Sequence, residues 1–120
     1  YQKKNFNQFD QYNMRYIQNR PNCFNADPFL YKFKNDNYLF VENYDFKKKR
    51  GNISSYIFKN NENNFLGEVL SEDFHLSFPY IFTFGNKIYM CPETHQVKEI
   101  RLYECVNFPL TWKYKKTLSL

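Results

Sequence analysis

One stretch of this chain is written twice. The segment NADPFLYKFKNDNYLFVE, residues 25–42, returns 51 positions later, so that Asp27 matches Phe78 and Glu42 matches Glu93. Proline, phenylalanine, tyrosine and glutamate recur at matched positions, and most other positions exchange one apolar side chain for another. A repeat period of ~50 residues is typical of solenoids and propellers, in which each repeat is one supersecondary unit. The chain is therefore expected to fold as two copies of one unit.

Both copies read as β-structure, because short aromatic and β-branched runs alternate with Asn- and Gly-containing breaks. The strands expected in the first copy cover residues 28–34, 37–43, 51–58 and 65–70. The strands expected in the second copy cover residues 79–84, 87–92, 98–106 and 112–118. Each copy is then a four-stranded antiparallel meander, which is one blade of a β-propeller.

The predicted fold is all-β, with a first blade at residues 23–73 and a second blade at residues 74–120. Residues 1–22 form an N-terminal arm that is either irregular or a short helix. A lone blade leaves one apolar face uncovered, and two blades cannot close a ring. Either further blades lie outside this segment, or the two blades pair with another chain in a homo-oligomer.

Composition limits the class of protein. Aromatic residues make up 22% of the 120 residues, which excludes a disordered chain. The net charge of +5 permits an anionic partner without requiring one. The aromatic residues alternate with polar ones in the expected strands, so they should fill blade interiors, and nucleic acid is not the expected partner. No apolar run approaches the ~18 residues of a membrane span, and no signal segment opens the chain.

The cysteines, and the absence of nucleophile and phosphate-binding motifs, limit the kinds of reaction and cofactor that are expected. Cys23, Cys91 and Cys105 form no CxxC motif and no even disulfide set, so we expect reduced cysteines in the core. Reduced cysteines favour a cytoplasmic location. The sequence has no Gly-rich phosphate loop and no serine- or cysteine-nucleophile signature, and no cofactor is expected.

Paired carboxylates mark one end of the first copy. In a hairpin that turns near Asn35, Asp27 and Glu42 lie opposite each other or nearly so. Cross-strand neighbours have Cβ atoms ~4.5–5.5 Å apart, and two acids that close raise the pKa of one of them. Such pairs serve glycosidic acid–base chemistry and plain sugar binding alike. In the second copy, Glu93 is expected to face Phe78, which offers a sugar one polar anchor and one stacking ring.

Several candidate residues could have a structural role instead of binding a ligand. Because glutamate recurs in both copies, Glu42 and Glu93 could instead cap strand ends by accepting backbone N–H bonds. His75 lies on the connection between the copies, where it either binds a sugar hydroxyl or phosphate or ties the blades together as a buried histidine. Arg101 is expected to pair with Glu93 or Glu99, as a ligand-binding group or as solvated strand decoration. His95 has no second ligand at metal spacing, so no metal site is predicted.

Several strings occur in this order and at about this spacing in one family. They are NADPFL, YLFVE, FHLSFPY, IYMCPE, and IRLY followed by FP and W. Over about residues 20–118 the chain resembles the propeller domain at the N-terminus of plant glucosamine inositol phosphorylceramide transferases. A similar domain accompanies bacterial formyltransferase-like and glycosyltransferase-like proteins of surface-glycan synthesis. It is similar, more distantly, to the five-bladed propellers of the arabinanase and invertase glycosidases.

The resemblance implies a carbohydrate-related role and, at full length, about five blades. The glycosidase relatives place a catalytic carboxylate where Asp27 stands, at the start of the inner strand of the first blade. Asp27 is therefore the candidate catalytic residue. The chain departs from their pattern at the next blade, where Phe78 occupies the matched position. Glycosidase activity would need carboxylates from outside this chain.

The leading hypothesis is recognition of a carbohydrate or nucleotide-sugar within a glycan-biosynthesis transferase. A transferase domain in the same or a partner chain would then supply the chemistry. The candidate substrate-binding residues are Asp27, Glu42, His75, Phe78, Glu93 and Arg101. Two alternatives remain: a glycosidase-like hydrolase completed by other carboxylates, and a non-catalytic protein-interaction module that uses exposed blade edges.

Overall fold

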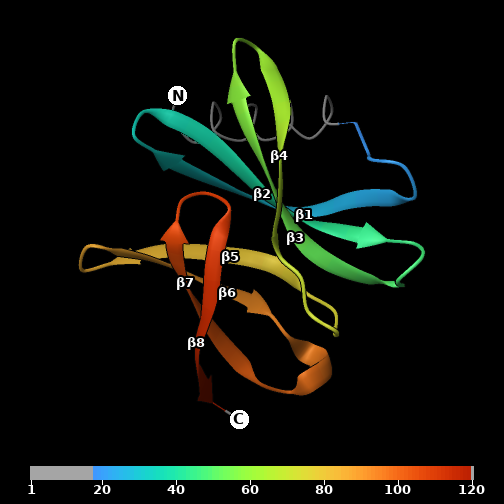
Figure 1. Cartoon of the computed structure of the whole chain (residues 1–120), viewed down its shortest axis with the longest axis vertical. Helices are drawn as coiled ribbons and strands as arrows, with labels where there is room; N and C mark the ends of the chain where they lie inside the picture. Colours follow the sequence, from blue (N-terminus) through green and yellow to red (C-terminus); the bar gives the residue numbers. More distant parts are fainter. Residues whose placement is uncertain (1–17, 120) are drawn as a thin grey trace, which may run out of the picture.

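The computed structural model describes residues 18–119, which form two four-stranded sheets (Figure 1). The first sheet contains β1 (Cys23–Phe33), β2 (Asp36–Asp45), β3 (Arg50–Lys59) and β4 (Glu62–Leu70). The second sheet contains β5 (Ser77–Phe84), β6 (Lys87–Glu93), β7 (Ile100–Asn107) and β8 (Thr111–Ser119). Within residues 18–119, the one helical element is the 3-10 turn η1 (His95–Val97). The predicted all-β fold of two antiparallel meanders is confirmed, and residues 1–17 of the predicted arm lie outside the described residues.

Tight turns join the strands where the sequence offers Asn or Gly. Lys34 and Asn35 between β1 and β2 both have positive φ, and so do Asn60 and Asn61 between β3 and β4. Positive φ at both central residues is the mark of a type I′ turn, whose twist matches that of the flanking strands. Asparagine tolerates this conformation better than most residues. The local sequence therefore fixes where each hairpin reverses.

Each sheet has a bulge in its first strand. In the first sheet Ala26 pairs with Glu42 and Phe29 with Phe40, so Asp27 and Pro28 together oppose one residue of β2. The first strand was expected to begin at residue 28, whereas β1 begins at Cys23 and contains Asp27 and Pro28 in its bulge.

The second sheet repeats this irregularity at the matched place. Ser77 pairs with Glu93 and Tyr80 with Cys91, which leaves Phe78 and Pro79 in the bulge of β5. Asp27 and Phe78 both have left-handed backbone, with φ of 49° and 45°. The two copies therefore share the left-handed backbone conformation of the first bulge residue as well as their sequence pattern.

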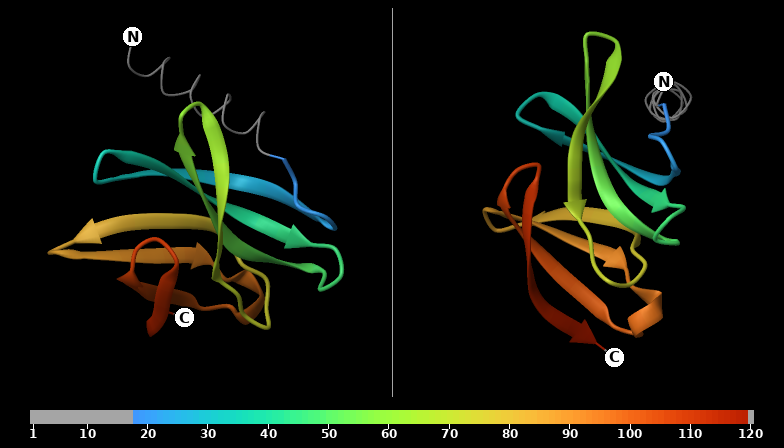
Figure 2. Two further views of the ribbon diagram at one scale, coloured as in Figure 1. Left: turned by 45° about the horizontal axis from the view of Figure 1, so that its top comes forward. Right: turned by 45° about the vertical axis from the view of Figure 1, so that its right-hand side comes forward.

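The two sheets lie as two layers, with β1–β4 in blue to green over β5–β8 in yellow to red (Figure 2). The first strand of the second sheet, β5, contacts β1, β2 and β3. The main core fills the space between the layers. Its buried members are Phe40, Ile53, Val69, Leu70, Phe74, Leu76, Ile81, Met90, Tyr103 and Trp112. The described residues form two open sheets and no closed ring, so the propeller and its number of blades stay a prediction.

Candidate functional site

Three carboxylates and a histidine gather where β1 and β2 meet the start of the second sheet. Glu42 lies on β2 opposite Ala26, beside the bulged Asp27, and its side chain hydrogen-bonds the Asp27 carboxyl group. Glu42 is only 8% exposed. Glu93 lies close enough for its charge to act on Glu42. The structure thus brings together three of the predicted acids, although their roles stay a prediction.

The surroundings of Glu42 favour its protonated form. Burial raises the pKa of Glu42 to about 7, and the hydrogen bond to Asp27 and the charges of Asp27 and Glu93 act in the same direction. A buried carboxylate loses hydration, and neighbouring anions disfavour a further negative charge. Glu42 therefore exchanges a proton near neutral pH, so Asp27 and Glu42 form a pair that can both donate and accept a hydrogen bond.

His75 connects this pair to the backbone of the first sheet. Its Nδ1 atom accepts a hydrogen bond from the Gly51 N–H at 2.8 Å, so the neutral ring carries its proton on Nε2. Nε2 lies 3.5 Å from Oε2 of Glu42. The next residue, Leu76, donates its N–H to the Gly51 carbonyl at 3.0 Å. This arrangement joins the segment between the sheets to β3 and orients the imidazole towards the Glu42 carboxyl group.

Gly51 makes the close approach possible. A Cβ atom at this position would lie 2.5 Å from the Leu76 carbonyl oxygen and 2.8 Å from Cγ of Glu42. It would also lie 3.0 Å from Cε1 of His75. Since distances under ~3.0 Å are repulsive contacts for carbon, no other residue fits here without moving the histidine or the glutamate. The position of His75 against Glu42 depends on this glycine.

The second sheet presents a different pair at the matched place. Glu93 lies opposite Ser77, whose hydroxyl donates to Oε1 of Glu93 at 3.1 Å. Phe78 occupies the bulge next to them and is 59% exposed. Glu93 was expected to face Phe78, but its direct cross-strand partner is Ser77, and Phe78 is the next residue along β5.

A small cleft runs between the two bulges. It has a volume of about 150 Å³ and is lined by Asp27, Pro28, Phe29, Phe78, Pro79 and Tyr80. The two matched residues, one acidic and one aromatic, therefore face the same cavity from different sheets. The rings of Phe29 and Tyr80 meet edge to face, with centroids 5.6 Å apart. The cleft is an apolar, aromatic hollow with one carboxylate on its wall.

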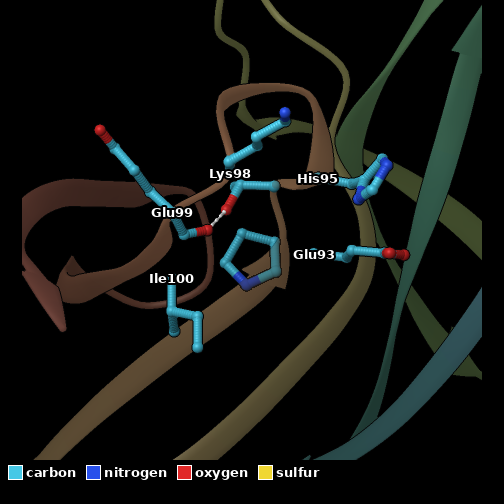
Figure 3. A pocket seen from close by; sticks show the side chains of 7 residues that line it. Glu93, His95, Lys98, Glu99 and Ile100 are labelled. Carbon is cyan, nitrogen blue, oxygen red and sulfur yellow. Dashed lines mark hydrogen bonds between the residues drawn. The ribbon is translucent and has the colours of Figure 1, made fainter. Parts of the chain in front are cut away.

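A second cavity lies beside η1 (Figure 3). It has a volume of about 260 Å³ and is lined by Pro92, Glu93, Thr94, His95, Lys98, Glu99 and Ile100. The Thr94 hydroxyl donates to the Glu99 carbonyl and closes the loop around it (Figure 3). Gln96 in the same loop accepts the His75 N–H at 2.8 Å through Oε1. The loop therefore supports the histidine of the main site, and Glu93 lies on the wall of the cavity.

Arg101 makes its contacts away from the Asp27–Glu42 pair. Its Nε donates to Oε1 of Glu99 at 2.8 Å, and a second nitrogen lies 3.9 Å from Glu72. Its guanidinium lies 4.9 Å from the ring centroids of both Phe74 and Tyr114. Of the two acidic partners expected from the sequence, Glu99 is the one the structure provides. Arg101 therefore packs against the segment between the sheets, and the structure does not bring it to the other candidate residues.

The thiols are poorly suited to nucleophilic chemistry. All three cysteines are free. Burial raises the pKa of Cys91, and burial raises the pKa of Cys105 to about 11. Because the thiolate is the reactive form, both side chains behave as small apolar groups.

Two searches of residues 18–119 gave negative results. No group of three or more His, Cys, Asp or Glu side chains in this range is arranged to hold a metal ion. In the same range, we find no helix with the length and apolar character needed to cross a bilayer.

Sequence reasoning missed Gly51, Ser77, Gln96 and Tyr80. Gly51 is one of three glycines in the chain, and no local sequence pattern marks its close approach to His75 and Leu76. Ser77 and Gln96 carry no pattern that marks them before the strands are placed. Tyr80 could have been found, since it is the repeat partner of Phe29.

Comparison with known proteins identifies the family. Residues 13–119 match the family described as glucosamine inositolphosphorylceramide transferase 1, N-terminal. The chain belongs to this family. The match covers the repeat, both bulges and every candidate residue named above, which supports the plant-transferase part of the resemblance. No solved structure matches the chain.

Curated relatives agree with this family of transferase N-terminal domains. Glucosamine inositolphosphorylceramide transferase 1 of Arabidopsis thaliana is 41% identical over 100 residues, which are 82% of this chain and 13% of that protein. The proteins of the same name from Oryza sativa subsp. indica and subsp. japonica are each 40% identical over 100 residues, with the same coverage. The chain therefore spans 13% of the length of the curated relatives it matches.

Proposed function

We propose that this chain recognises a sugar or nucleotide-sugar as part of a transferase of glycan biosynthesis. The observation that carries the proposal is the hydrogen-bonded carboxyl pair Asp27–Glu42 beside a cleft with exposed aromatic rings. Carboxyl groups bind sugar hydroxyls as acceptors or donors, and the faces of aromatic rings cover the apolar face of a sugar. Asp27 and Phe78 supply these two kinds of contact on one cavity.

The size and charge of the cleft favour one sugar ring rather than an extended glycan. The cavity is about 150 Å³, and its lining is mostly apolar. Glu42 contacts both Asp27, through a hydrogen bond, and His75, whose Nε2 lies 3.5 Å from its Oε2. In this proposal Asp27 touches the ligand, while Glu42 and His75 position it. Glu93 provides a further polar contact at the second sheet.

The two sheets are proposed to be successive blades of a propeller. Support comes from their head-to-tail stacking, from the shared bulge and from the order of strands within each sheet. The curated relatives are named as transferases and are several times longer than this chain. We therefore assign binding and orientation to this segment and the group-transfer chemistry to a transferase domain in the same or a partner chain. Location in the cytoplasm is part of the same proposal and rests on the unpaired cysteines.

The test is a binding titration of the chain followed by NMR, with glucosamine, myo-inositol and UDP-N-acetylglucosamine as probes. Binding of at least one probe should shift the amide signals of residues around both bulges. Asp27→Asn should weaken that binding about tenfold, which corresponds to the loss of one hydrogen bond to a charged group. Asparagine keeps the left-handed backbone of this position. Asp36→Asn, which alters a carboxylate of the β1–β2 hairpin, is the matched control.

Absence of binding for all three probes, or equal binding by the Asp27→Asn chain, would refute the proposal. A hydrolase is the second candidate, because a buried carboxyl group with a pKa raised to about 7, such as that of Glu42, can act as a general acid beside a second carboxyl group. Turnover of a glycoside by the chain, lost in Asp27→Asn while binding is kept, would favour the hydrolase instead.

A further inference from the structure

The face of the first sheet that meets the second sheet carries a cluster of aromatic rings. Its members are Phe29, Tyr31, Phe33, Tyr38 and Phe40, here called the first socket. The ring of Phe108, from the turn between β7 and β8, lies inside this cluster. Its centroid is 4.2 Å from that of Phe33, in a stacked arrangement, and 4.8 Å from that of Tyr38, edge to face. Its distances to Tyr31 and Phe40 are 5.7 Å and 5.9 Å.

The turn that carries Phe108 is held in shape by its own residues. Nε1 of Trp112 donates to the Pro109 carbonyl at 2.7 Å, which closes the turn. The Trp112 ring then meets Phe40 edge to face, at 6.2 Å between centroids. Phe108, Pro109 and Trp112 thus form an aromatic plug that the first socket receives. Aromatic pairs of this kind add stability beyond that of the area that they bury.

The second sheet carries the same constellation at the repeat offset. Tyr80, Phe82, Phe84 and Tyr89 match Phe29, Tyr31, Phe33 and Tyr38, and they are here called the second socket. The rings of Tyr80 and Phe82 stack at 5.7 Å, and those of Phe82 and Tyr89 at 5.5 Å. Cys91 stands where the first socket has Phe40. The second socket is therefore already ordered, with a smaller residue at its base.

Among residues 18–119, the Phe29 ring of the first sheet reaches the edge of the second socket at Tyr80, and the plug of this chain lies in the first socket instead. Ile81 and Met90 point from the second sheet into the core between the layers. Because side chains alternate along a strand, Tyr80 and Phe82 point to the opposite face. Tyr80 is 55% exposed and Phe84 is 75% exposed, whereas Phe82 and Tyr89 are partly buried. Every residue of the first socket is at least partly buried. A contiguous exposed aromatic surface of this kind marks an interaction site.

We infer that the second socket binds the aromatic–proline turn of a further four-stranded sheet, stacked on the second sheet as the second is stacked on the first. Two different faces meet in this packing, so the interface is of the head-to-tail type and can be repeated. The inference rests on the proposed stacking of blades. Because Tyr80 also lines the proposed sugar cleft, Phe84, which lies outside that cleft, is the residue that separates the two proposals.

A second copy of this chain fits the second socket poorly. Its first sheet would present the β3–β4 turn, which has Asn60 and Asn61 where the plug has aromatic and proline residues. Its second sheet does have a plug, but Phe108 already occupies the first socket of its own chain. The partner is therefore a sheet with its own plug, and self-association is the outcome against which the inference is tested.

The experiment uses the 120-residue chain and a backbone-cyclised peptide of residues 101–117, which contains the plug. Arg101 and Thr117 are cross-strand partners, so cyclisation joins positions that are already adjacent. The peptide should bind the chain saturably and shift the NMR signals of β5 and β6. Tyr80→Ser and Phe84→Ser should each weaken binding at least tenfold. Phe46→Ser, which changes an aromatic residue 53% exposed on the β2–β3 turn, should leave it unchanged.

Two further variants make the result decisive. A peptide with Phe108→Ala and Trp112→Ala should not bind, and Asp27→Asn in the chain should leave peptide binding intact even where it abolishes sugar binding. The inference fails if a peptide shown by NMR to form the hairpin does not bind, or binds the Phe84→Ser chain equally well. It also fails if sedimentation shows a dimer of the chain that Phe84→Ser dissociates, because a second copy then fills the socket.

Discussion

The two bulges have the same backbone and opposite chemistry. In the first sheet the bulge presents Asp27, which is hydrogen-bonded to Glu42 beside His75. In the second sheet the bulge presents Phe78, and the matched acid, Glu93, accepts a hydrogen bond from Ser77. The left-handed backbone is easily adopted by aspartate and poorly by phenylalanine. The fold therefore sets the geometry of both sites, and the residue at the tip of each bulge decides what that site can do.

The supports of the two sites also differ. Gly51 gives the first site its close contact with His75 and Leu76. At the matched position of the second sheet stands Lys98, at the end of η1. The first site is thus built into the packing between the sheets, whereas the second is attached to a surface loop. Changes at the first site should consequently cost stability, and changes at the second should not.

Gly51→Ala should have the largest effect. The added methyl group would press on the Leu76 carbonyl, Glu42 and His75, and we expect a loss of about 3 kcal/mol in the free energy of unfolding. Urea denaturation measures it. Gly85→Ala is the control, since nothing lies within 4 Å of a Cβ there and only the positive φ is unfavourable, at about 1 kcal/mol. Equal effects of the two substitutions would mean that the packing around Gly51 is not as tight as described.

The pH dependence of stability should separate the two glutamates. Because the pKa of Glu42 is raised to about 7 in the folded chain, the folded state holds its proton more tightly than the unfolded state does. The free energy of unfolding should then fall by about 2.5 kcal/mol between pH 5 and pH 8. The lowered pKa values of Asp45 and Glu104 act below this window, where carboxylates of the unfolded chain titrate.

Two matched variants check this assignment by urea denaturation across the same pH range. Glu42→Gln should remove most of the fall, because glutamine cannot lose a proton. Glu93→Gln should reduce the fall only slightly, since the Glu93 charge is one of several causes of the raised pKa of Glu42. A fall that persists in Glu42→Gln would assign it to another group.

Phe78→Asn should have the smallest effect and the opposite sign. A bulky residue in the left-handed region costs about 1–3 kcal/mol, which asparagine largely avoids. The ring is mostly exposed, so little buried area is lost, and the net gain should be about 1 kcal/mol by urea denaturation. Tyr80→Asn, at a position without positive φ, should give no such gain. A lower free energy of unfolding in Phe78→Asn would show that packing of the Phe78 ring stabilises the fold by more than the left-handed backbone costs.

The repeat predicted most of the fold. The strands expected at residues 37–43 and 79–84 correspond to β2 and β5. The turns between strands contain Asn35 and Gly85, which have the positive φ that Asn and Gly adopt readily. Strand ends were less accurate. The β4 strand begins at Glu62, three residues before the expected start, because pairing with β3 overrides the low strand propensity of Asn63 and Asn64.

The site was only partly visible from the sequence. The neighbourhood of Asp27 and Glu42 followed from the hairpin, but the bulge that turns Asp27 outward did not, since it depends on how β1 pairs. His75 and Gly51 are 24 residues apart and meet only through the stacking of the sheets. The contacts of Arg101 with Glu72 and Phe74 likewise join residues far apart in the sequence and could not be predicted from local patterns. Local patterns identify strands and hairpins, whereas contacts between layers require the fold.

The bulged residues have a consequence for how such a domain can diversify. Each bulge contains one residue more than the pairing of the strands requires. Two residues, Asp27 with Pro28 or Phe78 with Pro79, oppose one residue of the adjacent strand. Substituting the first member of either pair leaves the register of every other residue intact. Successive repeats can therefore carry different binding residues at the same position of the bulge. The strands on either side of the bulge need not change.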